Sequence, residues 1–108
     1  MKEKFEYVKW YAKIAKDGTV DIFFYEVDLE NERYATRMVW VHPDRNAEAI
    51  IEPGFEFITE EPIPEISEIN IEDEYFAEII SKEEFEDVYQ CNEYLGNMEF
   101  PKSNAFPT

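Results

Sequence analysis

The first half of the chain contains three segments rich in β-branched and aromatic residues, and only short turn sequences separate them. The segments are residues 5–14, 20–29 and 33–42, with Asp17-Gly18 and Glu30-Asn31 between them. Residues of these types favour β-strands, and Asp-Gly is a typical hairpin turn. Consecutive strands with such short connections pair with their neighbours in sequence. The sequence therefore predicts an antiparallel meander.

Proline residues divide the middle of the chain into shorter elements. Pro43-Asp44 ends the third strand, and residues 47–51 and 55–59 have the composition of further short strands. Pro62-Ile63-Pro64 restricts the backbone to extended conformations and predicts a rigid crossing. Residues 65–70 are then expected to form one helical turn.

The second half has one ambiguous element and one clear one. Residues 71–80 fit both a strand and a helical stripe, and we favour the strand. A helix is predicted over residues 82–95. Ser81 and Glu84 have the spacing of a capping box before it, and Gly96 is placed to end it.

Together these elements predict a single α+β domain, an antiparallel meander of four or five strands with one or two helices packed on one face. The domain is expected to cover residues 1–96, and residues 97–108 to form an irregular tail. The chain has 108 residues, of which 44% are hydrophobic, so it can form a core without disulfides. The single cysteine, Cys91, excludes an internal disulfide and is expected to be a half-buried apolar residue. Without a signal-peptide pattern or a long apolar run, we expect a cytoplasmic protein.

No set of residues with recognisable catalytic chemistry stands out. Gly18, Gly54 and Gly96 lie far apart, so a glycine-rich phosphate loop is absent. His42 has no Cys or His companions for zinc, and its expected role is that of a surface residue at a strand end. Glu72-Asp73-Glu74 lacks the regular spacing and central glycine of a calcium loop. We therefore expect no catalysis, no cofactor and no metal.

Negative charge is concentrated in the second half of the chain. Residues 1–54 hold eleven Asp and Glu against eight Lys and Arg, whereas residues 55–108 hold fifteen against two. Such a field repels nucleic acids and anionic membranes and attracts basic proteins. A surface that only keeps the protein soluble is the alternative. Because an almost uncompensated acidic half costs stability through self-repulsion, we favour binding of a basic partner.

Aromatic residues supply the second part of the expected binding surface. In the first strand, Tyr7 and Tyr11 lie on the face opposite Val8 and Trp10, and Trp40 occupies a similar position in the third strand. If helices cover one face only, these rings stay exposed. If the helix and the tail cover both faces, they are buried. Exposed Tyr and Trp beside acidic residues are typical of protein interfaces.

Several short motifs point to a known family. They are Trp10, Glu32-Arg33-Tyr34, Arg37-Met38-Val39, Pro62-Ile63-Pro64, Glu68-Ile69-Asn70 and Ser81 through Val88. Together, over residues 5–90, they resemble an uncharacterised family of small bacterial α+β proteins, immunity-protein-like and classed as a domain of unknown function. The resemblance implies a bacterial α+β domain and transfers no catalytic or binding residue. The chain departs from the family pattern at Pro43-Asp44-Arg45-Asn46 and beyond residue 91.

The leading hypothesis is a cytoplasmic immunity protein, as in contact-dependent growth inhibition, that binds and neutralises a cationic bacterial toxin. A nuclease is the expected target, because a nuclease needs basic groups to hold phosphates. The alternatives are a DNA mimic that inhibits a DNA-binding protein and a small enzyme with paired carboxylates. The toxin, the binding face and the oligomeric state stay open. The expected partner-binding residues are Glu65, Glu68, Glu72, Asp73, Glu74, Glu78, Glu83, Glu86 and Asp87, with Tyr7, Tyr11 and Trp40 as aromatic anchors.

Overall fold

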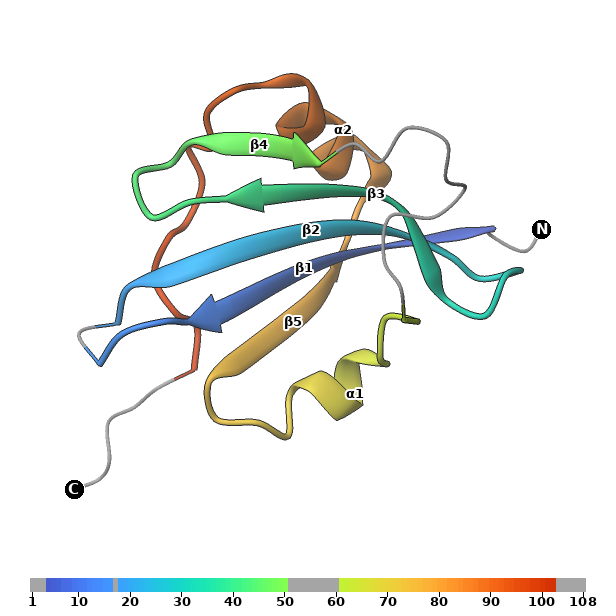
Figure 1. Cartoon of the computed structure of the whole chain (residues 1–108), viewed down its shortest axis with the longest axis horizontal. Helices are drawn as coiled ribbons and strands as arrows, with labels where there is room; N and C mark the ends of the chain where they lie inside the picture. Colours follow the sequence, from blue (N-terminus) through green and yellow to red (C-terminus); the bar gives the residue numbers. More distant parts are fainter. Residues whose placement is uncertain (1–3, 17, 51–60, 103–108) are drawn as a thin grey trace.

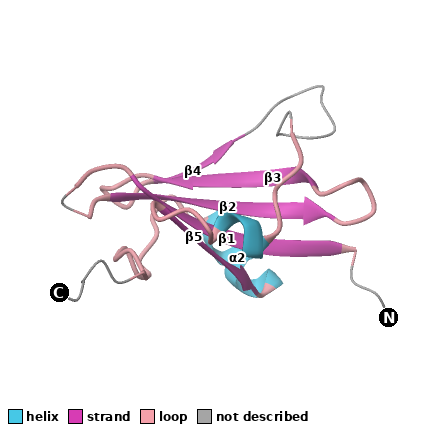
Figure 2. Cartoon of the chain, turned by 90° about the horizontal axis from the view of Figure 1, so that it is seen from below, coloured by secondary structure: helices cyan, strands magenta, loops and turns pink. Residues whose placement is uncertain are grey.

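A computed structural model describes residues 4–16, 18–50 and 61–102. These residues form a five-stranded antiparallel sheet in the order β4-β3-β2-β1-β5 (Figure 1). The strands are β1 (Phe5–Lys13), β2 (Val20–Asp28), β3 (Tyr34–Val41), β4 (Ala47–Ile50) and β5 (Tyr75–Ile80). Their directions fan out across the sheet, as the usual sheet twist requires (Figure 2). The predicted α+β fold with a meander is confirmed, and the predicted strand at 55–59 lies outside the described residues.

Turns at the predicted positions join the strands of the meander. Gly18, between β1 and β2, has a φ of +93°, a conformation that glycine adopts without steric cost. Between β2 and β3, the Asp28 carboxylate accepts hydrogen bonds from the Glu30 N–H (3.0 Å) and from Asn31 Nδ2 (2.8 Å). Between β3 and β4, the Asp44 carboxylate accepts from the backbone N–H two residues later, at 2.9 Å. These local bonds fix the register of the strands.

Two helices contact the sheet, α1 (Ile66–Ile69) and α2 (Lys82–Gln90). Ser81 Oγ accepts from the Glu84 N–H at 3.0 Å, which is the first of the two hydrogen bonds of the predicted capping box. The predicted helical turn at 65–70 and the strand favoured for residues 71–80 are confirmed by α1 and β5. The predicted end of the second helix is wrong, because α2 stops at Gln90 instead of continuing to residue 95.

Helix α2 ends early because the backbone that follows it pairs with the β3–β4 turn. The Ala47 N–H donates to the Asn92 carbonyl, and the Tyr94 N–H donates to the Arg45 carbonyl, both at 2.9 Å. The Arg45 guanidinium also donates to the carbonyls of Tyr94 (2.9 Å) and Gly96 (2.8 Å). These non-local bonds replace the bonds of further helical turns. The backbone is already extended at Cys91, whose side chain is exposed and not half-buried as expected.

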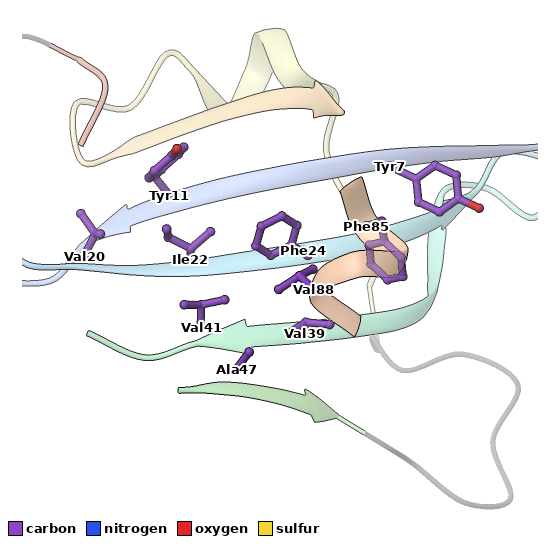
Figure 3. Close-up of a cluster of buried hydrophobic side chains, with 10 residues drawn as sticks. All are labelled: Tyr7, Tyr11, Val20, Ile22, Phe24, Val39, Val41, Ala47, Phe85 and Val88. Atoms are coloured by element: carbon purple, nitrogen blue, oxygen red, sulfur yellow. The ribbon is translucent and has the colours of Figure 1, made fainter. Parts of the chain in front are cut away.

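One face of the sheet, called here the α2 face, carries the larger part of the core. Phe24 and Val39 of β2 and β3 are buried together with Phe85 and Val88 of α2 (Figure 3). Beyond α2, Met98 and Phe100 of the C-terminal segment pack against the same cluster. This face is therefore covered along most of its length.

The opposite face, called here the α1 face, is covered by a smaller set of side chains. Val8, Val27 and Ala77 from the sheet pack against Ile69 of α1 and against Ile63 of the extended crossing before it. The two helices thus divide between the faces, in contrast to the expected placement on one face. The reason is that alternate positions of the central strands are apolar on both sides, so each side needs cover.

Asn70 closes the outer edge of β5. Its Nδ2 donates to the Ala77 carbonyl at 3.0 Å, and its Oδ1 accepts from the Ala77 N–H at 2.7 Å. The Tyr75 N–H on the same edge donates to the Glu72 carbonyl at 3.2 Å. Lys102 Nζ then donates to the carbonyls of Asn70 and Glu72, both at 2.7 Å, so the C-terminal segment holds this connection. An edge strand with its polar groups occupied is a poor template for another strand.

Candidate functional site

The sheet separates the predicted acidic residues into two groups. The group around α1 and its connection to β5 consists of Glu65, Glu68, Glu72, Asp73 and Glu74. The group on the α2 side consists of Glu78, Glu83, Glu86 and Asp87. Glu78 and Glu86 are half-buried, and the others are exposed. A partner that contacts one side of the sheet therefore meets one of the two groups.

Glu86 belongs to an internal ion-pair network. Arg37 Nη2 lies 2.7 Å from carboxylate oxygens of both Glu86 and Glu26, and Arg37 Nε donates to Glu26 at 2.9 Å. Glu26 also accepts from Thr36 Oγ1 (2.7 Å) and Tyr7 Oη (2.8 Å). Burial opposes ionisation of Glu26, but these hydrogen bonds outweigh it and lower its pKa to about 2. The bond from Arg37 lowers the pKa of Glu86 as well, so Glu86 is a structural residue.

Tyr7 and Tyr11 are buried, and the prediction that their rings are exposed is wrong. They are 7% and 2% exposed and lie in the core of the α2 face. The Tyr7 ring packs 5.3 Å from the Phe85 ring, and burial and the hydrogen bond to Glu26 raise its pKa to about 12. Asn97 Nδ2, from the C-terminal segment, donates to Tyr11 Oη at 3.3 Å. Helix α2 and the C-terminal segment therefore cover this one face, whereas the alternative left open by the sequence had both faces covered.

Trp40 lies in a row of rings that crosses the α1 face from β5 to the end of β3. The rings, here called the aromatic row, follow in the order Tyr75, Trp10, Tyr25, Phe23, Trp40 and His42. Successive ring centroids lie 5.3, 6.1, 6.3, 5.9 and 4.2 Å apart. The first four separations are in the usual range for aromatic pairs, and the last pair, Trp40 and His42, is closer. All six side chains are half-buried. The row is thus one apolar strip that keeps part of its surface open.

The interior of the aromatic row contains polar groups that are short of partners. Among the described residues, the buried Nε1 atoms of Trp10 and Trp40 have no hydrogen-bond acceptor. Burial raises the pKa of Tyr25 to about 12. A buried N–H without an acceptor costs free energy of folding. If these rings served only to pack the fold, the two unpaired indole N–H groups would bring no benefit that offsets this cost.

A carboxylate closes the His42 end of the aromatic row. The His42 ring lies 4.2 Å from the Trp40 ring, and Glu48 Oε1 lies 3.0 Å from His42 Nε2. The Glu48 side chain is 53% exposed. It therefore places a negative charge in solvent directly beside the last two rings.

Acidic residues also flank the Tyr75 end of the row, where Glu72-Asp73-Glu74 directly precedes the strand. The last two of these acids line an open hollow with Lys13, at the end of β1, and Lys16 of the connection that follows, so this part carries both signs. Glu72 forms no ion pair within the described part of the chain. Glu65 Oε2 lies 3.7 Å from Arg33 Nε, and the Glu65 side chain is largely exposed. The Tyr75 end of the row is therefore negatively charged, and nearby lysine and arginine side chains compensate part of this charge.

This arrangement has the chemistry of a binding surface. The described residues contain no group of three or more His, Cys, Asp or Glu side chains that could hold a metal ion. Within the same residues, no helix is long and apolar enough to cross a membrane. An apolar strip with carboxylates at both ends accepts apolar side chains that have Lys or Arg beside them, and the ring faces also attract cations.

A family model matches residues 4–94, a span that includes all five strands and both helices. The chain belongs to the family described as Domain of unknown function (DUF6881). This confirms the resemblance to an uncharacterised family. The DUF6881 match contains the whole aromatic row and ends before the C-terminal residues that pack on the α2 face. No curated protein and no solved structure matches the chain.

Sequence reasoning found Trp40 but missed the other rings of the row in this DUF6881 chain. Trp10 was noted only as lying opposite Tyr7 and Tyr11, residues 20–29 were considered only as strand formers, and residues 71–80 only as a strand or a helical stripe. A usable signal lies in the turns. A two-residue turn at Asp17-Gly18 pairs Trp10 with Tyr25, whereas the observed connection pairs Trp10 with Phe23. The two registers differ by two residues, so both put these three rings on one face, and the observed β2–β3 register adds Trp40 to it. Register fixed from turns therefore indicates which aromatic residues share a face.

Proposed function

We propose that this chain is an immunity protein that binds and neutralises a cationic toxin in the cytoplasm of the bacterium that carries it. The toxin is expected to be a nuclease, because phosphate-binding enzymes present the basic surface that an acidic inhibitor can cover. The contact surface is the aromatic row with the carboxylates at its ends. One observation carries the proposal: six half-buried rings form a continuous strip on a protein with a net charge of −16.

The rings provide the expected affinity. Trp40 is packed between Phe23 and His42, so it is held in place before a partner arrives. Preorganised Trp and Tyr side chains near the centre of an interface are the usual hot spots. Tyr75, at the other end of the row, widens the strip so that it spans the sheet.

The carboxylates provide the expected association rate and the choice of partner. Most of the predicted acids keep exposed charge, and the residues without an ion pair among the described ones are Glu68, Glu72, Asp73, Glu74, Glu78, Glu83 and Asp87. Steering depends on the summed field of the molecule, so acids on both sides of the sheet contribute to it. Only those near the row are expected to touch the partner.

Neutralisation is tested by co-expressing the chain with any basic toxin domain that the genes neighbouring its own encode. The intact chain should restore growth, and Trp40→Ala should weaken binding by roughly 30-fold or more, the effect of losing a hot spot. Tyr89→Ala is the matched control, because it truncates another half-buried ring, which belongs to α2 and stacks on Phe85 outside the row. Urea unfolding of both variants corrects for any loss of fold. Equal binding by Trp40→Ala and the intact chain would contradict the assigned surface.

The charge argument is tested by the salt dependence of association. The association rate with the toxin domain should fall by roughly tenfold or more between low and high salt, as expected for steered encounter. An association rate that does not change with salt would exclude electrostatic steering and with it the reason for expecting a basic target.

A further inference from the structure

A second surface lies on the opposite side of the molecule, where the chain leaves α2 and passes the β3–β4 turn (Figure 1). Val88 of α2 and Tyr94 form part of a groove between the helix and the segment that follows it. Leu95 lines the same groove and is 76% exposed. An apolar side chain this exposed, next to a preformed groove, indicates a surface that remains to be covered.

Contacts within the fold fix both sides of the groove. On the segment side, Arg45 donates to the carbonyls of Tyr94 and Gly96, and the Tyr94 ring packs 5.5 Å from the Phe24 ring. A Cβ on Gly96 would lie only 2.3 Å from Tyr94 Oη, so the ring and the backbone fit closely. On the helix side, Val88 is buried in the core. The groove is therefore a feature of the packed fold.

The acidic side chains at the rim of this groove determine which kind of ligand fits it. Glu84, Asp87 and Glu93 line the groove, all three are exposed, and none forms an ion pair with a described residue. A purely apolar segment would remove water from these carboxylates without replacing its hydrogen bonds. A second copy of this chain would bring another net charge of −16 against them. A ligand with lysine or arginine beside an apolar side chain can pair its positive charge with the rim carboxylates and pack its apolar side chain against Leu95.

We propose that this groove binds a short protein segment in which basic residues flank an apolar side chain. The apolar side chain packs against Leu95 and Val88, and the basic groups pair with Glu84, Asp87 and Glu93. The site is separate from the aromatic row, which lies on the other face of the sheet. It does not depend on the proposed function.

The test is a titration of the full chain, labelled with nitrogen-15, with a short synthetic peptide of alternating lysine and leucine. Amide signals of residues 84–96 are expected to shift. The indole signals of Trp10 and Trp40, both in the aromatic row, should stay in place, because they report on the surface of the proposed function. Peptides with glutamate in place of lysine, or serine in place of leucine, should not bind.

Matched variants separate the groove from general attraction to an acidic protein. Leu95→Ser should weaken binding at least about tenfold, which equals about 1.4 kcal/mol, because a leucine contact is lost. Ile71→Ser makes the same kind of change at a side chain that is 75% exposed outside the groove, and should weaken it less than about twofold. Glu84→Gln should weaken binding more than Glu83→Gln, which removes an equal charge one residue away from the groove.

Three results would overturn the proposal: equal effects of Leu95→Ser and Ile71→Ser, equal effects of the two glutamate variants, or shifts of the Trp10 and Trp40 indole signals in place of the groove amides. The last result would favour the aromatic row as the only cationic-peptide site. Loss of toxin binding in Trp40→Ala with unchanged peptide binding would support two independent surfaces.

Discussion

Replacing Glu26 by Gln tests the electrostatic core of the α2 face. In the folded protein four donor groups converge on the Glu26 carboxylate, two from Arg37 and one each from Thr36 and Tyr7. A glutamine of the same shape accepts through one oxygen only, and its amide N–H groups face donors. Glu26→Gln therefore removes the charge and leaves Arg37 with Glu86 as its remaining carboxylate.

The size of the effect follows from the pKa of Glu26. Its folded-state pKa is about 2 against an ordinary value of 4.5. At about 1.4 kcal/mol for each tenfold change, the ionised form contributes about 3 kcal/mol to the free energy of unfolding at pH 7. Because the pKa is lowered on folding, this contribution is fully present above pH 4.5 and is lost as the pH falls towards 2. The difference between wild type and Glu26→Gln should shrink in parallel, to about half or less by pH 3.

Urea unfolding at several pH values, followed by circular dichroism, measures this difference. The other carboxylates titrate in both proteins, so their effects cancel in the comparison. Glu84→Gln is the control, since Glu84 is exposed and forms no ion pair with a described residue, and it should change stability by less than about 0.5 kcal/mol at every pH. A Glu26→Gln effect below about 1 kcal/mol at pH 7, or one undiminished at pH 3, would refute the reasoning.

Three further variants probe other parts of the fold. Burial raises the pKa of Tyr25 to about 12, so wild-type stability should fall as the pH rises above 10, and Tyr25→Phe should show a smaller fall in alkaline urea unfolding. Asn70→Ala leaves the N–H and C=O of Ala77 without their partner, so it should cost about 1–3 kcal/mol in urea unfolding, and sedimentation should detect association through the opened β5 edge. Gly96→Ala should destabilise by about 1–3 kcal/mol on thermal unfolding, because its Cβ would lie 2.3 Å from Tyr94 Oη, whereas an unchanged melting temperature would mean that the segment moves freely.

The strands were predictable because their information is local. Residues 5–14 and 20–29 combine sheet-forming residues with a turn that glycine makes possible, and the structure has β1 and β2 at these places. The same holds for α1 and for the beginning of α2, where Ser81 supplies the cap. In each case the residues that decide the structure lie within a few positions of one another.

The end of α2 was not predictable by the same means. Leu95 fits a helix that continues to residue 95, and Gly96 fits its end, but the bonds that stop α2 earlier come from Ala47 and Arg45, which are distant in sequence. Helix propensity differences are small compared with several non-local hydrogen bonds. The exposure of Cys91 follows from the same event, because the backbone is already extended there.

The candidate site was half predictable. Alternation correctly placed Tyr7 and Trp10 on opposite faces, but it does not state which face a helix will cover. The choice of Tyr7 and Tyr11 as exposed rings assumed that one face stays open, whereas α2 and the C-terminal segment cover theirs. Trp40, which was grouped with Tyr7 and Tyr11, lies instead on the face of Trp10, where its side chain is half-buried. Which face of a sheet is covered depends on tertiary packing, so the alternation of residues along one strand does not predict it.

The short length of α1 explains why the aromatic row is open at all. The helix has four residues and contributes Ile66 and Ile69 to the α1 face, near the β5 side of the sheet. It ends where the Asn70 side chain binds the backbone of Ala77, so the chain turns into β5 after one helical turn. A longer helix along this face would bury Trp10 and Tyr25 completely, as α2 buries Tyr7. The hydrogen bonds between Asn70 and Ala77 therefore do two things: they occupy the polar groups at the edge of β5, and they end α1 after one turn. Both the protection of this sheet edge and the exposure of the aromatic row thus depend on Asn70.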